Sequence, residues 1–121
     1  MSKKKRFLRL ESLVAYLQTE SDGDEIFIRY KDEKIAPVDA KFIRMTKDPV
    51  TLDVEIELDG DEKWIELELW DYDRFTLNDS LGKFALLVDQ AAETFTAELV
   101  RNKDSDARYV LNWSVIERRD K

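Results

Sequence analysis

Apolar and polar residues alternate one by one along most of the chain. This period of two is typical of β-strands that turn one face to a core and the other to water. The clearest example is "TLDVEIEL" at residues 51–58, and "KWIELELW" at residues 63–70 repeats it. Between them lies "DGDE", in which Gly60 readily accepts a positive φ, so the two segments are predicted to form a β-hairpin.

The same pattern predicts eight strands, over residues 6–18, 25–31, 34–43, 51–58, 63–70, 81–88, 95–101 and 108–116. The third strand contains Pro37, which has no N–H for a ladder and therefore indicates an edge or a kink. The stretch from residue 84 to residue 99 also fits a helical repeat. Phe95, Ala97 and Leu99 alternate with polar residues, however, which favours a strand.

Short, regularly spaced strands without repeats or linkers predict one domain, an all-β, eight-stranded antiparallel β-sandwich. The domain is expected to cover residues 1–121, with its core at about residues 6–116 and a basic tail at residues 1–5. Trp64, Trp70 and Trp113 lie in predicted strands and are interpreted as core or half-buried residues.

Composition argues against several classes of function. The formal net charge of −7 argues against general nucleic-acid binding, which needs a basic surface to displace counterions. The chain has no cysteine and no histidine, which excludes disulfides, thiolate metal sites and histidine-dependent catalysis. We therefore expect no enzymatic activity. No signal peptide or membrane-spanning run is visible, which predicts a cytoplasmic location, including the periphery of a membrane.

Connections that reverse the chain alternate between the two ends of a sandwich, so the first, third, fifth and seventh share one end. These four are rich in aspartate: Asp22, Asp24, Asp48, Asp71, Asp73, Asp79, Asp104 and Asp106. At the other end, lysines accompany two of the three connections. We therefore expect the excess of acidic charge at the end that the first, third, fifth and seventh connections share.

One stretch, "LWDYDRFTLNDSLG" at residues 69–82, concentrates three of these carboxylates. Asp71 and Asp73 share a face if the strand stays extended, and Asp79 returns after a loop. Asp22 and Asp24 arrive from the neighbouring connection. Calcium takes about six to eight oxygen ligands in a flexible shell, whereas magnesium requires a tighter octahedron. The pattern indicates either a calcium site or an acidic rim in contact with water.

The stretch "WDYDRFTLNDSLGKF" resembles the third calcium loop of C2 domains, the calcium- and lipid-binding β-sandwiches of synaptotagmins and protein kinases C. The family pattern there is W/Y-D-x-D-x-x-x-x-x-D followed by an apolar residue and glycine. Asp71, Asp73, Asp79 and the pair Leu81-Gly82 match it. "TKDPVTLDVEIEL" resembles the family's T-x-N-P-V stretch, and "SDGDEIFIRY" resembles the end of its first calcium loop. The resemblance covers roughly residues 8–116.

The resemblance implies that Asp24, Asp71, Asp73 and Asp79 are calcium ligands. The first loop departs from the family, because Gln18 stands where an acid is usual, and Asp22 or Glu20 is the predicted substitute. We therefore expect one calcium ion rather than two or three.

The implied function is a noncatalytic binding module whose calcium-loaded end docks to an anionic phospholipid membrane or to a protein partner. Phe75 and Leu77, at the tip of the third loop, are the predicted contacts, and packing beneath the loop is their alternative role. The competing hypothesis is a calcium-independent structural or interaction subunit of a larger assembly.

Overall fold

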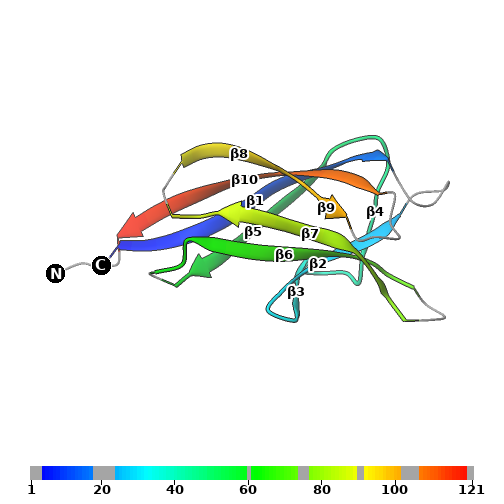
Figure 1. Cartoon of the computed structure of the whole chain (residues 1–121), viewed down its shortest axis with the longest axis horizontal. Helices are drawn as coiled ribbons and strands as arrows, with labels where there is room; N and C mark the ends of the chain where they lie inside the picture. Colours follow the sequence, from blue (N-terminus) through cyan, green and yellow to red (C-terminus); the bar gives the residue numbers. More distant parts are fainter. Residues whose placement is uncertain are drawn as a thin grey trace.

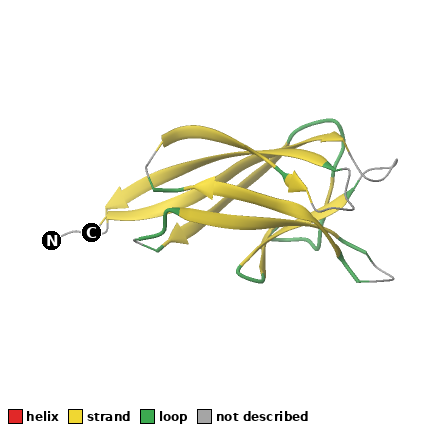
Figure 2. Ribbon diagram, in the orientation of Figure 1, coloured by secondary structure: helices red, strands yellow, loops and turns green. Residues whose placement is uncertain are grey.

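Two antiparallel sheets pack face to face in the computed structural model of the chain, which describes residues 4–17, 24–59, 61–73, 77–89, 92–101 and 107–119 (Figure 1, Figure 2). The antiparallel β-sandwich predicted from the sequence is confirmed. Among the described residues, no helix has the length and hydropathy that a membrane span requires.

The first sheet, named the β1 sheet, has the strand order β5 (Val50–Leu58), β1 (Lys4–Leu17), β10 (Arg108–Arg119) and β8 (Ala92–Glu98). The second, named the β2 sheet, has the order β3 (Glu33–Ala36), β2 (Glu25–Tyr30), β6 (Trp64–Asp71), β7 (Asp79–Leu87) and β9 (Val100–Arg101). The two-residue strand β4 (Ile43–Arg44) also pairs with β2.

The core lies between the two sheets and is filled by the apolar positions of the alternating pattern. Burial alternates along β6, so Ile65, Leu67 and Leu69 face inward. The inward face of β10 consists of Tyr109, Leu111, Trp113 and Val115. Burying one large apolar side chain contributes about 1.5–3 kcal/mol. The period-two pattern therefore supplies the main driving force for folding.

The predicted hairpin between residues 51–58 and 63–70 is wrong. β5 pairs with β1, whereas β6 pairs with β2 and β7, so their connection crosses from one sheet to the other. The turn itself is present, because Glu62 N donates to the carbonyl oxygen of Asp59 at 3.2 Å. A hairpin and a crossover both leave the apolar faces toward the core, so the alternation of residues cannot distinguish them.

The described part of the chain has ten strands rather than eight, because two predicted strands are divided. The third stops as β3 at Ala36, before Pro37, and resumes for two residues as β4. The seventh consists of β8 and then β9. The prediction of a strand rather than a helix at residues 95–99 is confirmed for 95–98. β1 starts at Lys4, inside the segment 1–5 that was predicted to be a basic tail.

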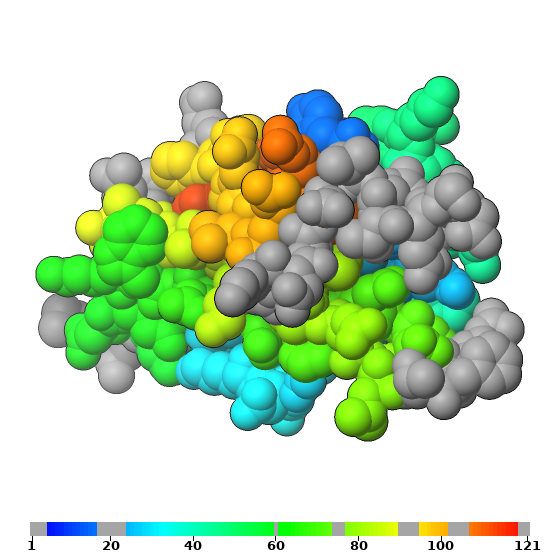
Figure 3. Space-filling model, turned by 45° about the vertical axis from the view of Figure 1, so that its right-hand side comes forward, coloured from blue at the N-terminus to red at the C-terminus, as the bar shows by residue number. Residues whose placement is uncertain are grey.

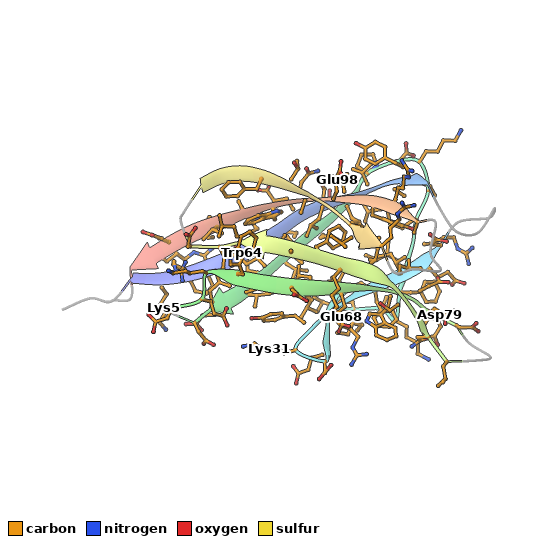
Figure 4. All side chains as sticks on the ribbon, in the orientation of Figure 1. Lys5, Lys31, Trp64, Glu68, Asp79 and Glu98 are labelled. Atoms are coloured by element: carbon orange, nitrogen blue, oxygen red, sulfur yellow. The ribbon has the colours of Figure 1, made fainter. Side chains whose placement is uncertain are left out.

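The three tryptophans differ in burial. Trp113 is buried against Phe95, with ring centroids 4.6 Å apart, and Trp70 is half-buried. Trp64 is 62% exposed, so its predicted core or half-buried position is wrong (Figure 4). The alternation along β6 explains this exposure, since Ile65 faces the core and its neighbour must face outward.

The segment 92–101 passes from one sheet to the other. β8 pairs with β10, and β9 then pairs with β7 at Gly82 and Lys83. Gly82 has a φ of +148°, and a Cβ atom there would collide with the carbonyl oxygen of Val100. Glycine therefore allows β9 to approach β7 closely enough to pair.

Ion pairs on the outer face of the β1 sheet join acids of β5 to basic residues of β1 and β10. The pairs are Arg9–Asp53 at 2.8 Å, Arg118–Glu55 at 2.8 Å and Lys5–Glu57 at 3.7 Å. All six side chains are in contact with solvent, with exposed fractions between 30% and 68%, so each pair contributes at most about 1 kcal/mol. The pairs neutralise the acidic face of β5 more than they stabilise the fold.

Arg6 ties the two sheets together at the end of the sandwich where β1 begins. Its guanidinium donates to the carbonyl oxygens of Val88, of Asp59 at 3.3 Å and of Glu62 at 3.0 Å. Val88 follows β7 of the β2 sheet, and the other two belong to the turn that crosses between sheets. One side chain thus supplies hydrogen-bond donors to carbonyl groups of the crossover, which does not pair with a neighbouring strand.

Replacing Arg6 with alanine is expected to lower the free energy of unfolding by about 1.5–3 kcal/mol, because the part-buried hydrogen bonds to the carbonyl oxygens of Val88 and Glu62 lose their charged donor. Urea denaturation followed by circular dichroism measures this change. Arg9→Ala is the control, since Arg9 has a surface ion pair with Asp53 and should cost no more than about 1 kcal/mol. Equal losses in the two variants would contradict the bridging role of Arg6.

Candidate functional site

The strand ends that flank four connections lie together at one end of the sandwich, which we name the loop end. It contains the last residues of β1 and β6 and the first residues of β2, β7 and β10, whereas β1 begins and β10 ends at the opposite, terminal end (Figure 1). Two backbone hydrogen bonds join segments there, from Met45 N to Asp24 O at 2.8 Å and from Tyr72 N to Glu25 O at 2.6 Å. The predicted gathering of these connections is confirmed for the described residues.

Asp24 lies at the loop end but faces the interior. It precedes β2 and continues the inward row of Ile26 and Ile28, and its exposed fraction is 0%. The hydroxyl of Tyr109 donates to Asp24 Oδ2 at 2.6 Å. Both side chains are buried, so this charge-assisted hydrogen bond offsets much of the cost of placing a carboxylate beside the core.

Asp71 and Asp79 face each other across neighbouring strands. Asp71 ends β6 and continues its inward row, and Asp79 begins β7 as the register partner of Asp71. Side chains at directly opposed positions of an antiparallel pair share a face. Asp71 is also the register partner of Ile26 on β2, two residues from Asp24. Three predicted ligands therefore come from three adjoining strand ends.

Aromatic side chains support this end of the β2 sheet from outside. Trp70 stacks on Phe27 with ring centroids 6.3 Å apart, and the guanidinium of Arg29 lies 5.1 Å from the Trp70 ring. Tyr72 stacks on Phe42 at 5.2 Å. These contacts hold residues on both sides of Asp71 in place.

Two further predicted residues, Asp73 and Leu77, lie in the connection between β6 and β7. Asp73 is half-buried, and its backbone N–H donates to Asn78 Oδ1 at 2.8 Å. Leu77 is 88% exposed, as expected for a contact residue. Asp22 and Phe75 lie outside the described residues.

Within the described ranges, no three acidic side chains are arranged as a group that could hold a metal ion. Asp24 is turned to Tyr109, and Asp79 is exposed at the rim. The predicted ligands are nevertheless all aspartates. Carboxylate oxygens suit a hard cation such as calcium rather than a transition metal.

Tyr109 is the residue that the sequence analysis missed as part of the site. It lies in the strand predicted over residues 108–116, but nothing in the sequence pairs it with an acid 85 residues away. Burial raises the pKa of the Tyr109 hydroxyl far above its ordinary value of 10.0, and the hydrogen bond to Asp24 and the charges of Asp24 and Asp71 act in the same direction.

The raised pKa has a consequence for stability at high pH. Above about pH 10 the tyrosine of the unfolded chain loses its proton while native Tyr109 keeps it, so the free energy of unfolding falls as pH rises. Tyr109→Phe should lower the free energy of unfolding by about 1–3 kcal/mol near pH 7. Above pH 10, the free energy of unfolding of this variant should fall less steeply with pH than that of the parent. Urea denaturation at several pH values measures both effects. Tyr16→Phe, at a tyrosine that is 70% exposed, should change neither.

Comparisons with known proteins bear on the fold. No protein-family model matches the chain, and no curated protein matches it in sequence. A C2 domain (the A domain) of plant extended synaptotagmin 1 superimposes with a TM-score of 0.61 at 13% identity, covering 100% of this chain and 98% of that one. Human GIVD cytosolic phospholipase A2 gives a TM-score of 0.61 at 10% identity, covering 96% of this chain and 16% of that one. The chain therefore has the C2-like fold that its sequence resembles.

Proposed function

We propose that the chain is a noncatalytic C2-like binding module that takes up calcium at the loop end and then docks to an anionic phospholipid membrane, as a cytoplasmic protein at the membrane periphery. The observation that carries this proposal is the convergence of Asp24, Asp71 and Asp79 from three adjoining strand ends. Asp73 and Asp22, on the connections beside them, complete the proposed ligand set.

Calcium would change the charge balance at this end. Carboxylates that approach one another repel, and the repulsion is strongest where low-dielectric core lies behind them, as at Asp24 and Asp71. A bound divalent cation would replace that repulsion with attraction and draw the two acidic connections together. The loop end would then present less negative charge to an anionic surface, with Leu77 and Phe75 beside it.

One observation favours the alternative, a calcium-independent interaction subunit. Tyr109 already donates to Asp24, so this buried carboxylate has a partner without any metal. In a protein that uses the sandwich only as a scaffold, this hydrogen bond would be enough to stabilise the buried carboxylate. Direct measurement of calcium binding separates the two functions.

Calcium is expected to stabilise the protein, and Asp73→Asn is expected to remove most of that effect. At one hundred times Kd, a bound ligand adds about 2.7 kcal/mol, which raises the melting temperature of a domain this size by several degrees. Asp73→Asn keeps the side-chain shape but removes one charge from the proposed site. Calorimetric titration and thermal unfolding, each in calcium and in chelator, measure the effect.

Asp89→Asn is the matched control, because it removes one exposed acidic charge just after β7, at the terminal end. It should bind calcium as the parent does. Unchanged melting of the parent in millimolar calcium would favour the calcium-independent function. Parent-like calcium binding by Asp73→Asn would instead remove Asp73 from the site.

Membrane docking is expected to depend on Leu77. Burying one leucine is worth about 1.5–3 kcal/mol, so Leu77→Ala should weaken calcium-dependent binding to phosphatidylserine vesicles by about tenfold. Co-sedimentation in calcium and in chelator measures it. Trp64→Ala removes another exposed apolar side chain, at the terminal end, and should leave pelleting unchanged. If calcium binds but no vesicles pellet, the partner of this end is a protein.

A further inference from the structure

A groove opens where the chain passes from the β1 sheet to the β2 sheet. β8 stays paired to β10 as far as Glu98, Leu99 N donates to Tyr109 O at 3.0 Å, and β9 then pairs with β7. The groove has a volume of about 570 Å³ and is lined by Tyr16, Glu98, Leu99, Arg101, Arg108, Tyr109 and Val110. Figure 3 shows the atoms of β8, β9 and the start of β10 side by side on one face.

The charge of this groove differs from that of the protein as a whole. The chain has a net charge of −7, yet the described residues that line the groove include two arginines and one acidic residue, Glu98. Arg101 and Arg108 are both exposed, and neither has an ion pair within the part of the chain that the structure describes. On the outer face of the β1 sheet, by contrast, Arg9 and Arg118 are paired with acids of β5.

The other walls are apolar and aromatic. Leu99 and Val110 are half-buried, Tyr16 is 70% exposed, and Val100, next to the groove, is 66% exposed. Tyrosine and arginine beside apolar surface are the combination that is enriched where proteins bind one another. A volume of about 570 Å³ lies within the range of about 300–1,000 Å³ that is typical of ligand sites.

We propose that this groove binds a short acidic segment of a protein partner. Carboxylates of that segment pair with Arg101 and Arg108, whose planar guanidinium groups suit bidentate contacts, and an apolar side chain between them packs on Leu99 and Val110. A lipid surface fits less well, since membrane-binding patches collect about four to eight basic residues, and this groove has two beside Glu98. The proposal is independent of calcium.

The test is fluorescence anisotropy with the full chain in chelator. The probes are fluorescein-labelled nonapeptides in which glutamate alternates with leucine, phenylalanine or tyrosine, together with the same peptides carrying glutamine for glutamate. At least one acidic peptide should bind, and the glutamine peptides should not. Arg101→Glu combined with Arg108→Glu should weaken binding by roughly tenfold or more.

The matched control combines Lys41→Glu with Lys47→Glu. Both lysines are exposed, and the control changes the net charge by the same amount. It should bind as the parent does. Should the arginine variant fail to fold by circular dichroism, NMR of the parent decides, because bound peptide must shift the amide signals of Leu99, Val100 and Val110.

Four results would overturn the proposal. They are no binding of any acidic peptide, equal binding of the glutamine peptides, an equal loss in the lysine control, and bound peptide that shifts amide signals elsewhere but not at the groove. Phosphatidylserine vesicles form the last arm. If the arginine variant loses vesicle binding while no peptide binds the parent, the occupant of the groove is a lipid and the proposal fails.

Discussion

The loop end depends on one geometric constraint: a strand presents alternate side chains to the core until it ends. At the loop end the inward row of β2 begins with Asp24, one residue before the strand, and the inward row of β6 ends with Asp71, so neither terminal position is apolar. A carboxylate beside an apolar core requires a partner, and Tyr109 provides one from β10 in the opposite sheet. The acidic site is therefore a continuation of the core, and the packing of the two sheets determines where its carboxylates lie.

The sequence predicted what alternation and turn residues encode. Inward rows such as Leu67 and Leu69 follow from local pattern, and the common end of the odd-numbered connections follows from reversal of the chain. The alternation of residues does not predict which strands pair, because a strand with one apolar face fits a hairpin and a crossover equally well. The contact of Tyr109 with Asp24 joins distant segments, and no local pattern signals it. The third-loop aspartates could be predicted as ligands because they are close together in sequence.

Charge is distributed unevenly over the molecule. On the outer face of the β1 sheet, acids of β5 have basic partners, so most of that surface is locally neutral. At the loop end the acidic residues Asp24, Asp71 and Asp79 adjoin one another, and among the described residues that line the groove Arg101 and Arg108 outnumber the one acid, Glu98. These two regions have opposite electrostatic requirements, so they suit ligands of opposite sign.

The crossing of segment 92–101 also affects how well strands of other molecules can pair with the edges of the sheets. On one side of the sandwich this segment forms the edge strand of both sheets, since β8 pairs with β10 and β9 pairs with β7. On the other side, β5 is interrupted by a bulge at Asp53, whose φ is +51°, and β3 has four residues and stops before Pro37. Short, charged or bulged edges resist addition of a strand from another molecule. The sandwich thus has built-in protection against edge-to-edge aggregation, and recognition falls to loops and side chains rather than to the exposed backbone.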